Sequence, residues 1–239
     1  MLMLTELQQY KSVFPIPNKL VGVEFLTSAF SVVKYPLLAY AFSDLPVADR
    51  PIAVNKAAWL DMGDSNESQT NMFELAELPR KLAEQFEAYV SGGLPYGFTA
   101  QDFRSEQAVA PKLFAAILHD RLLREYDSAS VLVCHNWFGF FKPFIVRLLQ
   151  VFGFQTAFLD QLQFYDTALM FKAALNDDLP KPGEAYWQYV DRTVKTKAKG
   201  KINLEAASTF LQISRRDRSN IVASNLVLLS DMVDKLRTL

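Results

Sequence analysis

The feature that most constrains the fold is the alternation of short apolar segments with longer amphipathic ones in the second half of the chain. Residues 130–134 (SVLVC) form an apolar run of strand length. Residues 110–126 before it and 141–152 after it carry apolar side chains at helical spacing, and Gly153 ends the second of them. Such alternation predicts an α/β sheet with helices on its faces.

The first part of the chain has a different pattern. Residues 19–26, 36–43 and 51–60 are short apolar segments that predict consecutive strands without helices between them. Strands in tandem favour an antiparallel portion, and a further strand is expected near 157–165. The sequence therefore predicts a mixed five-stranded sheet in a single domain, residues 1–239.

The remaining segments complete this outline. We expect residues 1–18 to be a lead-in, closed by Pro15 and Pro17, and residues 61–92 to be an insertion that is polar at first and then helical. Further helices are predicted from Thr167, over 203–211 and over 220–237, with a Pro/Asp loop from Asn176 to Gly183.

Composition excludes several classes of protein. The 239 residues include 25 Lys and Arg against 26 Asp and Glu, so any nucleic-acid binding must come from a local patch. Cys134 is the single cysteine, which excludes an internal disulfide and a cysteine-rich zinc site. We find no run of about 18 apolar residues and no cationic signal segment. These features predict a soluble, intracellular protein with no membrane partner.

Common catalytic motifs are absent. The sequence has no GxGxxG, no GxxxxGK[ST], no HExxH and no GxSxG. Its two histidines, His119 and His135, lack the spacing of metal ligands. Cys134 lies within an apolar strand and is interpreted as a buried, unreactive thiol.

Five short segments carry information about function when their order along the chain is considered together. They are 96–103 (YGFTAQDF), 131–136 (VLVCHN), 140–145 (FFKPFI), 165–169 (YDTAL) and 202–207 (INLEAA). Together they resemble the DEDD 3′–5′ exonucleases, a family that includes proofreading exonucleases and oligoribonucleases. The resemblance extends over roughly residues 19–237 and implies an RNase H-like fold.

The chemistry of that family implies which residues to look for. Two divalent cations about 3.5–4 Å apart activate a water and stabilise the leaving oxygen. Hard cations require carboxylate oxygens. The resemblance implies Asp-x-Glu on the first strand, one Asp on the helix after the second motif, and one Asp on the last helix. A His or Tyr shortly before that last Asp would serve as general base.

This sequence departs from the family pattern at most of these positions. Gly22 occupies the first Asp position, and only Glu24 remains on the first strand. Phe141 occupies the second Asp position. On the last helix, Asn225 occupies the Asp position and Asn220 the His position.

The consequence for metal binding follows from the number of ligands. One carboxylate in place of four cannot offset two hard cations. Phe141 would place an apolar ring where a cation should lie. We therefore predict that no catalytic residue set is intact and that the two-metal mechanism is lost. Glu24 is either a relic held by a hydrogen bond or a single weak metal ligand. No cofactor is expected unless the protein is an active exonuclease, in which case Mg²⁺ or Mn²⁺ is required.

The assignment on the last helix can be examined by helical geometry. At about 100° per residue, Asn225 lies at the edge of an apolar stripe, where a residue facing a cleft would sit. Asp231 and Asp234 fall on the opposite side and do not replace it. The stripe consists of Val222, Leu226, Leu229, Val233 and Leu236.

Two cationic segments are candidates for nucleic-acid binding. Both are interpreted either as solvated loops or as a rim that contacts phosphates. The first contains Arg192, Lys195, Lys197, Lys199 and Lys201 and no acid, and the second contains Arg215, Arg216 and Arg218.

The residues around the second motif also allow two interpretations. Asn136 is interpreted as a turn or cap residue, with a nucleotide contact as the alternative. Asp166 is interpreted as a helix N-cap. Trp137, Phe138 and Phe141 are candidates for the core or for a surface that contacts a protein partner, with base stacking as a further alternative.

The leading functional hypothesis is a catalytically inactive exonuclease homologue. It would be a nucleic-acid-binding or scaffolding subunit in a nucleic-acid-processing complex. Its expected partners are a protein of replication or RNA processing and single-stranded nucleic acid. The alternatives are a divergent, active, metal-dependent 3′–5′ exonuclease and a purely structural protein that uses the fold for protein contacts.

Overall fold

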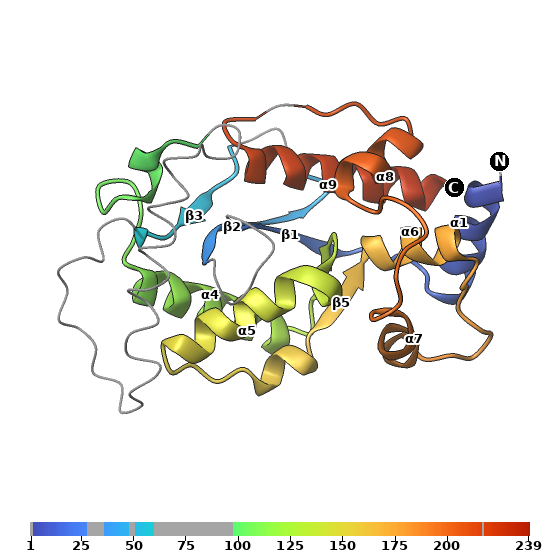
Figure 1. Ribbon diagram of the computed structural model, residues 1–239, viewed down its shortest axis with the longest axis horizontal. Helices are drawn as coiled ribbons and strands as arrows, with labels where there is room; N and C mark the ends of the chain where they lie inside the picture. The colour runs from blue at the N-terminus through green and yellow to red at the C-terminus, as the bar shows by residue number, and fades with distance from the viewer. Residues whose placement is uncertain (1, 28–35, 48–50, 60–97, 217) are drawn as a thin grey trace.

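A mixed five-stranded sheet forms the centre of the molecule (Figure 1). The computed structural model describes residues 2–27, 36–47, 51–59, 98–216 and 218–239. The strand order is β3-β2-β1-β4-β5, with β1 antiparallel to β2 and parallel to β4. The predicted mixed sheet is confirmed. Its strands are β1 (Leu20–Thr27), β2 (Leu37–Leu45), β3 (Val54–Lys56), β4 (Val131–Cys134) and β5 (Gln163–Asp166).

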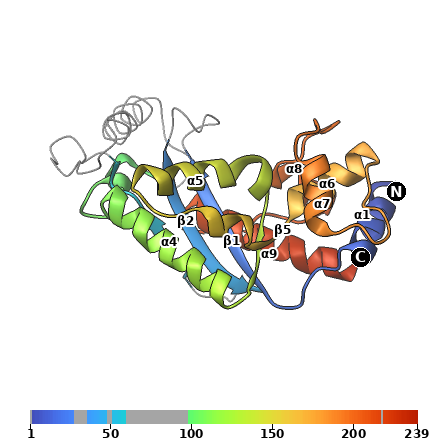
Figure 2. The same ribbon diagram turned by 90° about the horizontal axis from the view of Figure 1, so that it is seen from below.

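Helices cover both faces of this sheet. Helices α4 and α5 lie on one face and α9 lies on the other, as the two views in Figures 1 and 2 show. The helices are α1 (Leu2–Val13), α4 (Pro111–Asp127), α5 (Lys142–Val151), α6 (Thr167–Asn176), α7 (Tyr186–Thr193), α8 (Leu204–Phe210) and α9 (Ile221–Thr238). Shorter turns are η2 (Ala100–Phe103), η3 (Trp137–Phe141) and η4 (Ala157–Asp160). None of the helices in the described ranges is both long and apolar enough to cross a membrane.

The central strand β1 is buried along most of its length. Its first six residues are buried in sequence, without the alternation of a half-exposed strand. This continuous burial arises because helices pack against both faces of the sheet. Within β1, Gly22 is paired with Ser43 of β2 and Val133 of β4, and Glu24 is paired with Ala41 of β2. Side chains of β1 therefore lie in the interior.

Helix α9 packs on β1 and β2 as its apolar stripe predicts. Asn220 begins the helix, and its Oδ1 accepts a hydrogen bond from the amide of Ala223 at 3.0 Å. Such a cap satisfies one of the free N–H groups of the first turn. The five residues of the predicted stripe are all buried.

Residues 1–18 are more than a lead-in. Helix α1 packs on α6, and Leu7 and Tyr10 are fully buried. The Lys11 Nζ donates to the carbonyl oxygens of Leu236 and Arg237 at 3.0 and 3.1 Å. A cation at the last carbonyls of a helix is favourable because these groups have no partner within the helix. The chain termini therefore lie close together (Figure 1).

Other expectations are corrected in detail. Helix α7 was not predicted, and residues 157–160 form a 3₁₀ turn rather than the start of a strand, so that β5 begins at Gln163. The predicted insertion over residues 61–92 lies outside the described residues.

Candidate functional site

Two residues at positions that the family resemblance assigns, Glu24 and Asn225, form a polar bridge between β1 and α9. The Asn225 Nδ2 donates to the Glu24 Oε1 at 2.9 Å, and the Arg215 guanidinium donates to the Asn225 Oδ1 at 2.8 Å. Glu24 comes from β1, Asn225 from α9 and Arg215 from the loop before α9. We call Arg215, Asn225 and Glu24 the polar bridge. Helical geometry predicted Asn225 at the edge of the apolar stripe, and the structure shows that this side chain contacts Glu24 of β1.

Burial dominates the chemistry of Glu24. Its residue surface is only 5% exposed, and its Oε2 has no hydrogen-bond partner within the described part of the chain. Loss of solvent raises the pKa of Glu24 from 4.5 to about 8, although the Asn225 hydrogen bond and the Arg215 charge both lower it. The carboxyl group is therefore mostly protonated at neutral pH. In this state it is a poor ligand for a hard cation.

Gly22 lies where the family pattern has its first Asp, and leucine side chains surround it. A β-carbon built on Gly22 would lie 2.8 Å from the Leu45 Cδ2 and 2.9 Å from the Leu226 Cδ1. Both leucines are buried. Even the first atom of a side chain meets them, so a carboxylate does not fit at this position without repacking.

Aromatic rings occupy the region around Phe141. Phe141 is 9% exposed, and its ring centroid lies 5.4 Å from that of Phe25 on β1. Trp137 is fully buried and stacks on Phe164, with centroids 3.7 Å apart and planes 9° apart. Trp137 and Phe141 therefore belong to the core, and their prediction as a partner surface is wrong. Phe138 is half-buried.

Asp166 fixes the turn that follows β4. The amides of Asn136 and Phe138 donate to its carboxylate at 2.8 and 3.1 Å, and the amide of Ala168 donates at 3.0 Å. The predicted N-cap role of Asp166 is confirmed. Asn136 has a left-handed backbone with φ 72°, as expected of a turn residue. Burial raises the pKa of Asp166 to about 6, against the lowering effect of these backbone donors.

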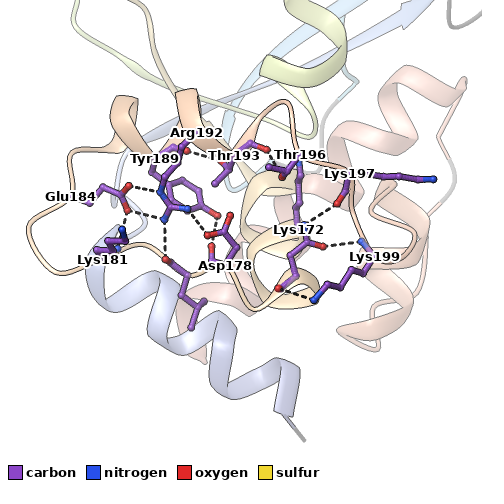
Figure 3. A network of polar contacts seen from close by, with 12 residues as sticks. Lys172, Asp178, Lys181, Glu184, Tyr189, Arg192, Thr193, Thr196, Lys197 and Lys199 are labelled. Carbon is purple, nitrogen blue, oxygen red and sulfur yellow. Dashed lines mark hydrogen bonds and ion pairs between the residues drawn. The ribbon is translucent and has the colours of Figure 1, made fainter.

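The first cationic segment is divided between buried and exposed side chains. The Arg192 Nε donates to the Glu184 Oε1 at 2.6 Å, and its other nitrogens donate to Asp178 and to the carbonyl of Leu179 (Figure 3). Arg192 is thus engaged in a structural network, and its role as a nucleic-acid ligand stays a prediction. Exposed lysines remain in this segment, and no acidic side chain of the described residues pairs with them. They are Lys195, Lys197, Lys199 and Lys201.

The second cationic segment is also engaged within the protein. Arg216 forms a two-pronged ion pair with Asp231 at 3.0 and 2.5 Å. Arg215 belongs to the polar bridge and lies 3.6 Å from Glu205. Arg218 is half-buried, and its backbone amide donates to the Ser224 Oγ at 2.8 Å. Arg215 and Arg216 therefore both have partners within the protein, and their role in a phosphate-contacting rim stays a prediction.

The described residues contain no cluster of three or more His, Cys, Asp or Glu side chains that could hold a metal ion. Asn220, at the family's general-base position, is occupied as a helix cap. His135 is buried, with Nδ1 against the Thr167 hydroxyl and Nε2 against the carbonyl of Ile202, and burial lowers its pKa to about 4. Burial raises the pKa of the Cys134 thiol, which agrees with the predicted unreactive thiol.

Comparison with solved structures identifies the architecture. Product-bound exonuclease I matches with a TM-score of 0.56 and 11% identity over 93% of this chain. The fold is exonuclease-like. The zinc-bound form of the E. coli exonuclease I–ssDNA complex matches with a TM-score of 0.53 and 10% identity over 90% of this chain. A complex of exonuclease I with SSB-Ct matches with a TM-score of 0.51 and 11% identity over 93% of this chain.

This chain spans less than half of those proteins, namely 44%, 40% and 43% of their lengths. No family model and no curated protein sequence matches the chain. At such low identity the likeness concerns the fold, and the predicted RNase H-like sheet is confirmed at this level.

Sequence reasoning missed three features of this region. Leu45 and Leu226 reach Gly22 from β2 and α9, and no local pattern indicates which side chains surround a glycine. Trp187, on α7, is 69% exposed. The spacing of Tyr186, Tyr189, Val190 and Thr193 is helical and is the signal that could have revealed α7.

Proposed function

We propose that this protein is a catalytically inactive exonuclease homologue that uses the exonuclease-like fold to bind nucleic acid as a non-enzymatic subunit. The polar bridge is the observation that carries the proposal. Arg215 brings a permanent positive charge to the side chains where the family pattern has its metal ligands. An Arg that satisfies Asn225, and through it Glu24, takes the electrostatic place of a cation.

The residues at this site do not fit a pair of divalent cations. Glu24 is the one carboxylate remaining at the four positions, and its raised pKa keeps it mostly protonated at neutral pH. Leu45 and Leu226 close the space beside Gly22, and Phe141 packs against Phe25. Hard cations bind six or more oxygen ligands, which these side chains do not supply.

The exposed lysines between α7 and α8 support retained contact with nucleic acid. Phosphates are bound by Lys and Arg side chains that are free of acidic partners. Solved relatives of the same fold include an exonuclease I–ssDNA complex, which makes nucleic acid a reasonable ligand class to test first.

A nuclease assay tests the loss of activity. Oligonucleotides of DNA and RNA, labelled at the end opposite to the expected attack, are incubated with Mg²⁺ or Mn²⁺ and the wild-type chain. We expect no metal-dependent shortening. Glu24→Gln serves as the control, because it removes the carboxylate and keeps the shape of the side chain. Shortening by the wild type that disappears in Glu24→Gln would establish an active divergent exonuclease.

A direct metal-binding measurement complements the assay. A ligand that binds the folded state raises its stability by RT ln(1 + [L]/Kd). We expect the shift of the thermal midpoint of the wild type to be the same with Mn²⁺ as with Ca²⁺, and we expect Glu24→Gln to show the same shift. A Mn²⁺-specific increase that depends on Glu24 would contradict the proposal.

A further inference from the structure

The segment between α7 and α8 has an ordered arrangement of charge. Lysines stand at every second position from residue 195 to residue 201, and all four are exposed. We call Lys195, Lys197, Lys199 and Lys201 the lysine row.

Two uncharged residues of this segment lie partly against the protein. Ala198 and Ile202 are half-buried, and Ile202 packs against the core. A β-carbon built on Gly200 would lie 3.5 Å from both terminal carbons of Leu175. The segment is a turn followed by bends, and the four lysine side chains are nevertheless all exposed.

The lysine row is held in place by α6. The Asn176 Nδ2 donates to the carbonyl of Lys197 at 3.0 Å, and the Asn176 Oδ1 accepts from the amide of Lys199 at 2.8 Å (Figure 3). The buried Lys172 Nζ donates to the carbonyl of Val194 at 3.0 Å. The backbone is therefore ordered before any ligand binds, which reduces the entropy cost of binding.

The four ammonium groups differ in their contacts. The Lys199 Nζ donates to the carbonyl of Asn176 at 3.2 Å, which leaves two of its three donors for a second ligand. Lys197 extends away from the network, as Figure 3 shows. Lys197 and Lys201 have no acidic partner in the described part of the chain, and both ammonium groups are therefore available to an anion.

Two arginines of the cationic segments already have acidic partners. Arg192 is paired with Asp178 and Glu184, and Arg216 is paired with Asp231. The lysine row therefore offers an anion positive charges that these arginines do not.

Trp187 supplies a second, independent observation. It is 69% exposed near the start of α7, and the lysine row begins two positions after this helix ends at Thr193. An exposed indole stacks on the bases of a single strand, whose faces are uncovered.

We propose that the lysine row and Trp187 form a binding site for single-stranded nucleic acid, with phosphates on the lysines and a base on the indole. This inference rests on the proposed function and assigns its ligand class and its surface. One end of the segment reaches the sheet, because the carbonyl of Ile202 contacts the His135 ring directly after β4. A strand bound along the row would therefore run toward Asn136 and the polar bridge.

The experiment measures binding of a fluorescent oligo-dT of about 20 nucleotides by anisotropy between about 50 and 200 mM salt. The test variant is Lys197→Gln with Lys201→Gln. The matched control is Lys112→Gln with Lys235→Gln, two exposed lysines on α4 and α9. Both variants change the net charge equally, and thermal unfolding verifies that both are folded.

The two kinds of contact predict different signatures. Each lost phosphate contact to a single strand lowers the slope of log K against log [salt] by about 0.7, so the double variant should lose about 1.4 and the control nothing. Trp187→Ala should weaken binding about tenfold with an unchanged slope, because stacking is not electrostatic, and Trp187→Phe should retain most of the affinity.

Other results would overturn the inference in distinguishable ways. Binding by the wild type that the test variant weakens no more than the control would refute the lysine row and leave the proposed function standing. Tighter binding of a duplex of equal length would refute the assignment of single-stranded nucleic acid as the ligand. No binding of the oligonucleotide by the wild type, or binding of polyglutamate in its place, would refute the proposed function as well.

Discussion

The protonation state of Glu24 makes a quantitative prediction about stability. Its pKa is raised from 4.5 to about 8 in the folded protein. Above pH 4.5 the unfolded chain releases this proton and the folded chain retains it, so the free energy of unfolding falls as pH rises toward 8. At about 1.4 kcal/mol per pH unit, the loss over the whole window is about 5 kcal/mol.

Glu24→Gln should remove this dependence. The Gln side chain keeps an oxygen for the Asn225 Nδ2 and has no proton to lose. We expect the wild type to lose about 1.7 kcal/mol between pH 6.5 and 8, and the variant to lose none of this contribution. The pKa of Asp166, raised to about 6, and that of His135, lowered to about 4, affect stability at lower pH and are shared by both proteins.

Urea unfolding followed by circular dichroism from pH 5 to pH 9 measures the difference. Glu205→Gln is the matched control, because Glu205 lies 3.6 Å from the same Arg215 and its side chain is 74% exposed. Its profile should follow that of the wild type. Parallel profiles for the wild type and Glu24→Gln would refute the argument and would mean that Glu24 is ionised when buried.

Three further changes test the site and its corrections. Gly22→Asp should lower the free energy of unfolding by about 3 kcal/mol or more, because it overpacks the site and buries a charge. The double variant with Asn225→Asp should show no metal-dependent nuclease activity, and shortening of an oligonucleotide by it would contradict this. Trp137→Ala should lower the free energy of unfolding in urea by about 4 kcal/mol, and Phe138→Ala should lower it by about half as much, because Phe138 is half-buried. Equally small losses for the two variants would contradict the assignment of Trp137 to the core. Arg192→Gln should lower the thermal midpoint and leave the salt dependence of oligonucleotide binding unchanged. A reduced salt dependence would instead show that Arg192 contacts a phosphate.

Local patterns were sufficient for most of the architecture. The apolar run that became β4 and the stripe that became the buried face of α9 were readable because periodicity is a property of neighbouring residues. The departures at Gly22, Phe141 and Asn225 were likewise visible, because the resemblance assigns positions along the chain. The contact of Glu24 with Asn225, two residues 201 positions apart, was not predicted and is seen only in the folded chain.

The sequence did not indicate which charged side chains form ion pairs. Arg192 and Lys197 are five residues apart in one cationic segment, yet Arg192 meets Asp178 and Glu184 while Lys197 remains exposed. Arg192 lies on α7 and reaches two acidic residues of the preceding loop, whereas Lys197 lies beyond the end of this helix. Charge along a sequence indicates which groups are available, and only the folded chain decides which of them are neutralised.

The sequence by itself predicted the sheet and most of the helices that cover it, because these depend on residue identity and short-range periodicity. The tertiary structure decided which side chains surround the positions that the family resemblance assigns. Arg215 reached Asn225, leucines closed on Gly22, and Trp137 stacked within the core, because packing brings together side chains from distant parts of the chain. Such long-range contacts carry no local signal, and they determine which residues remain exposed to meet a ligand.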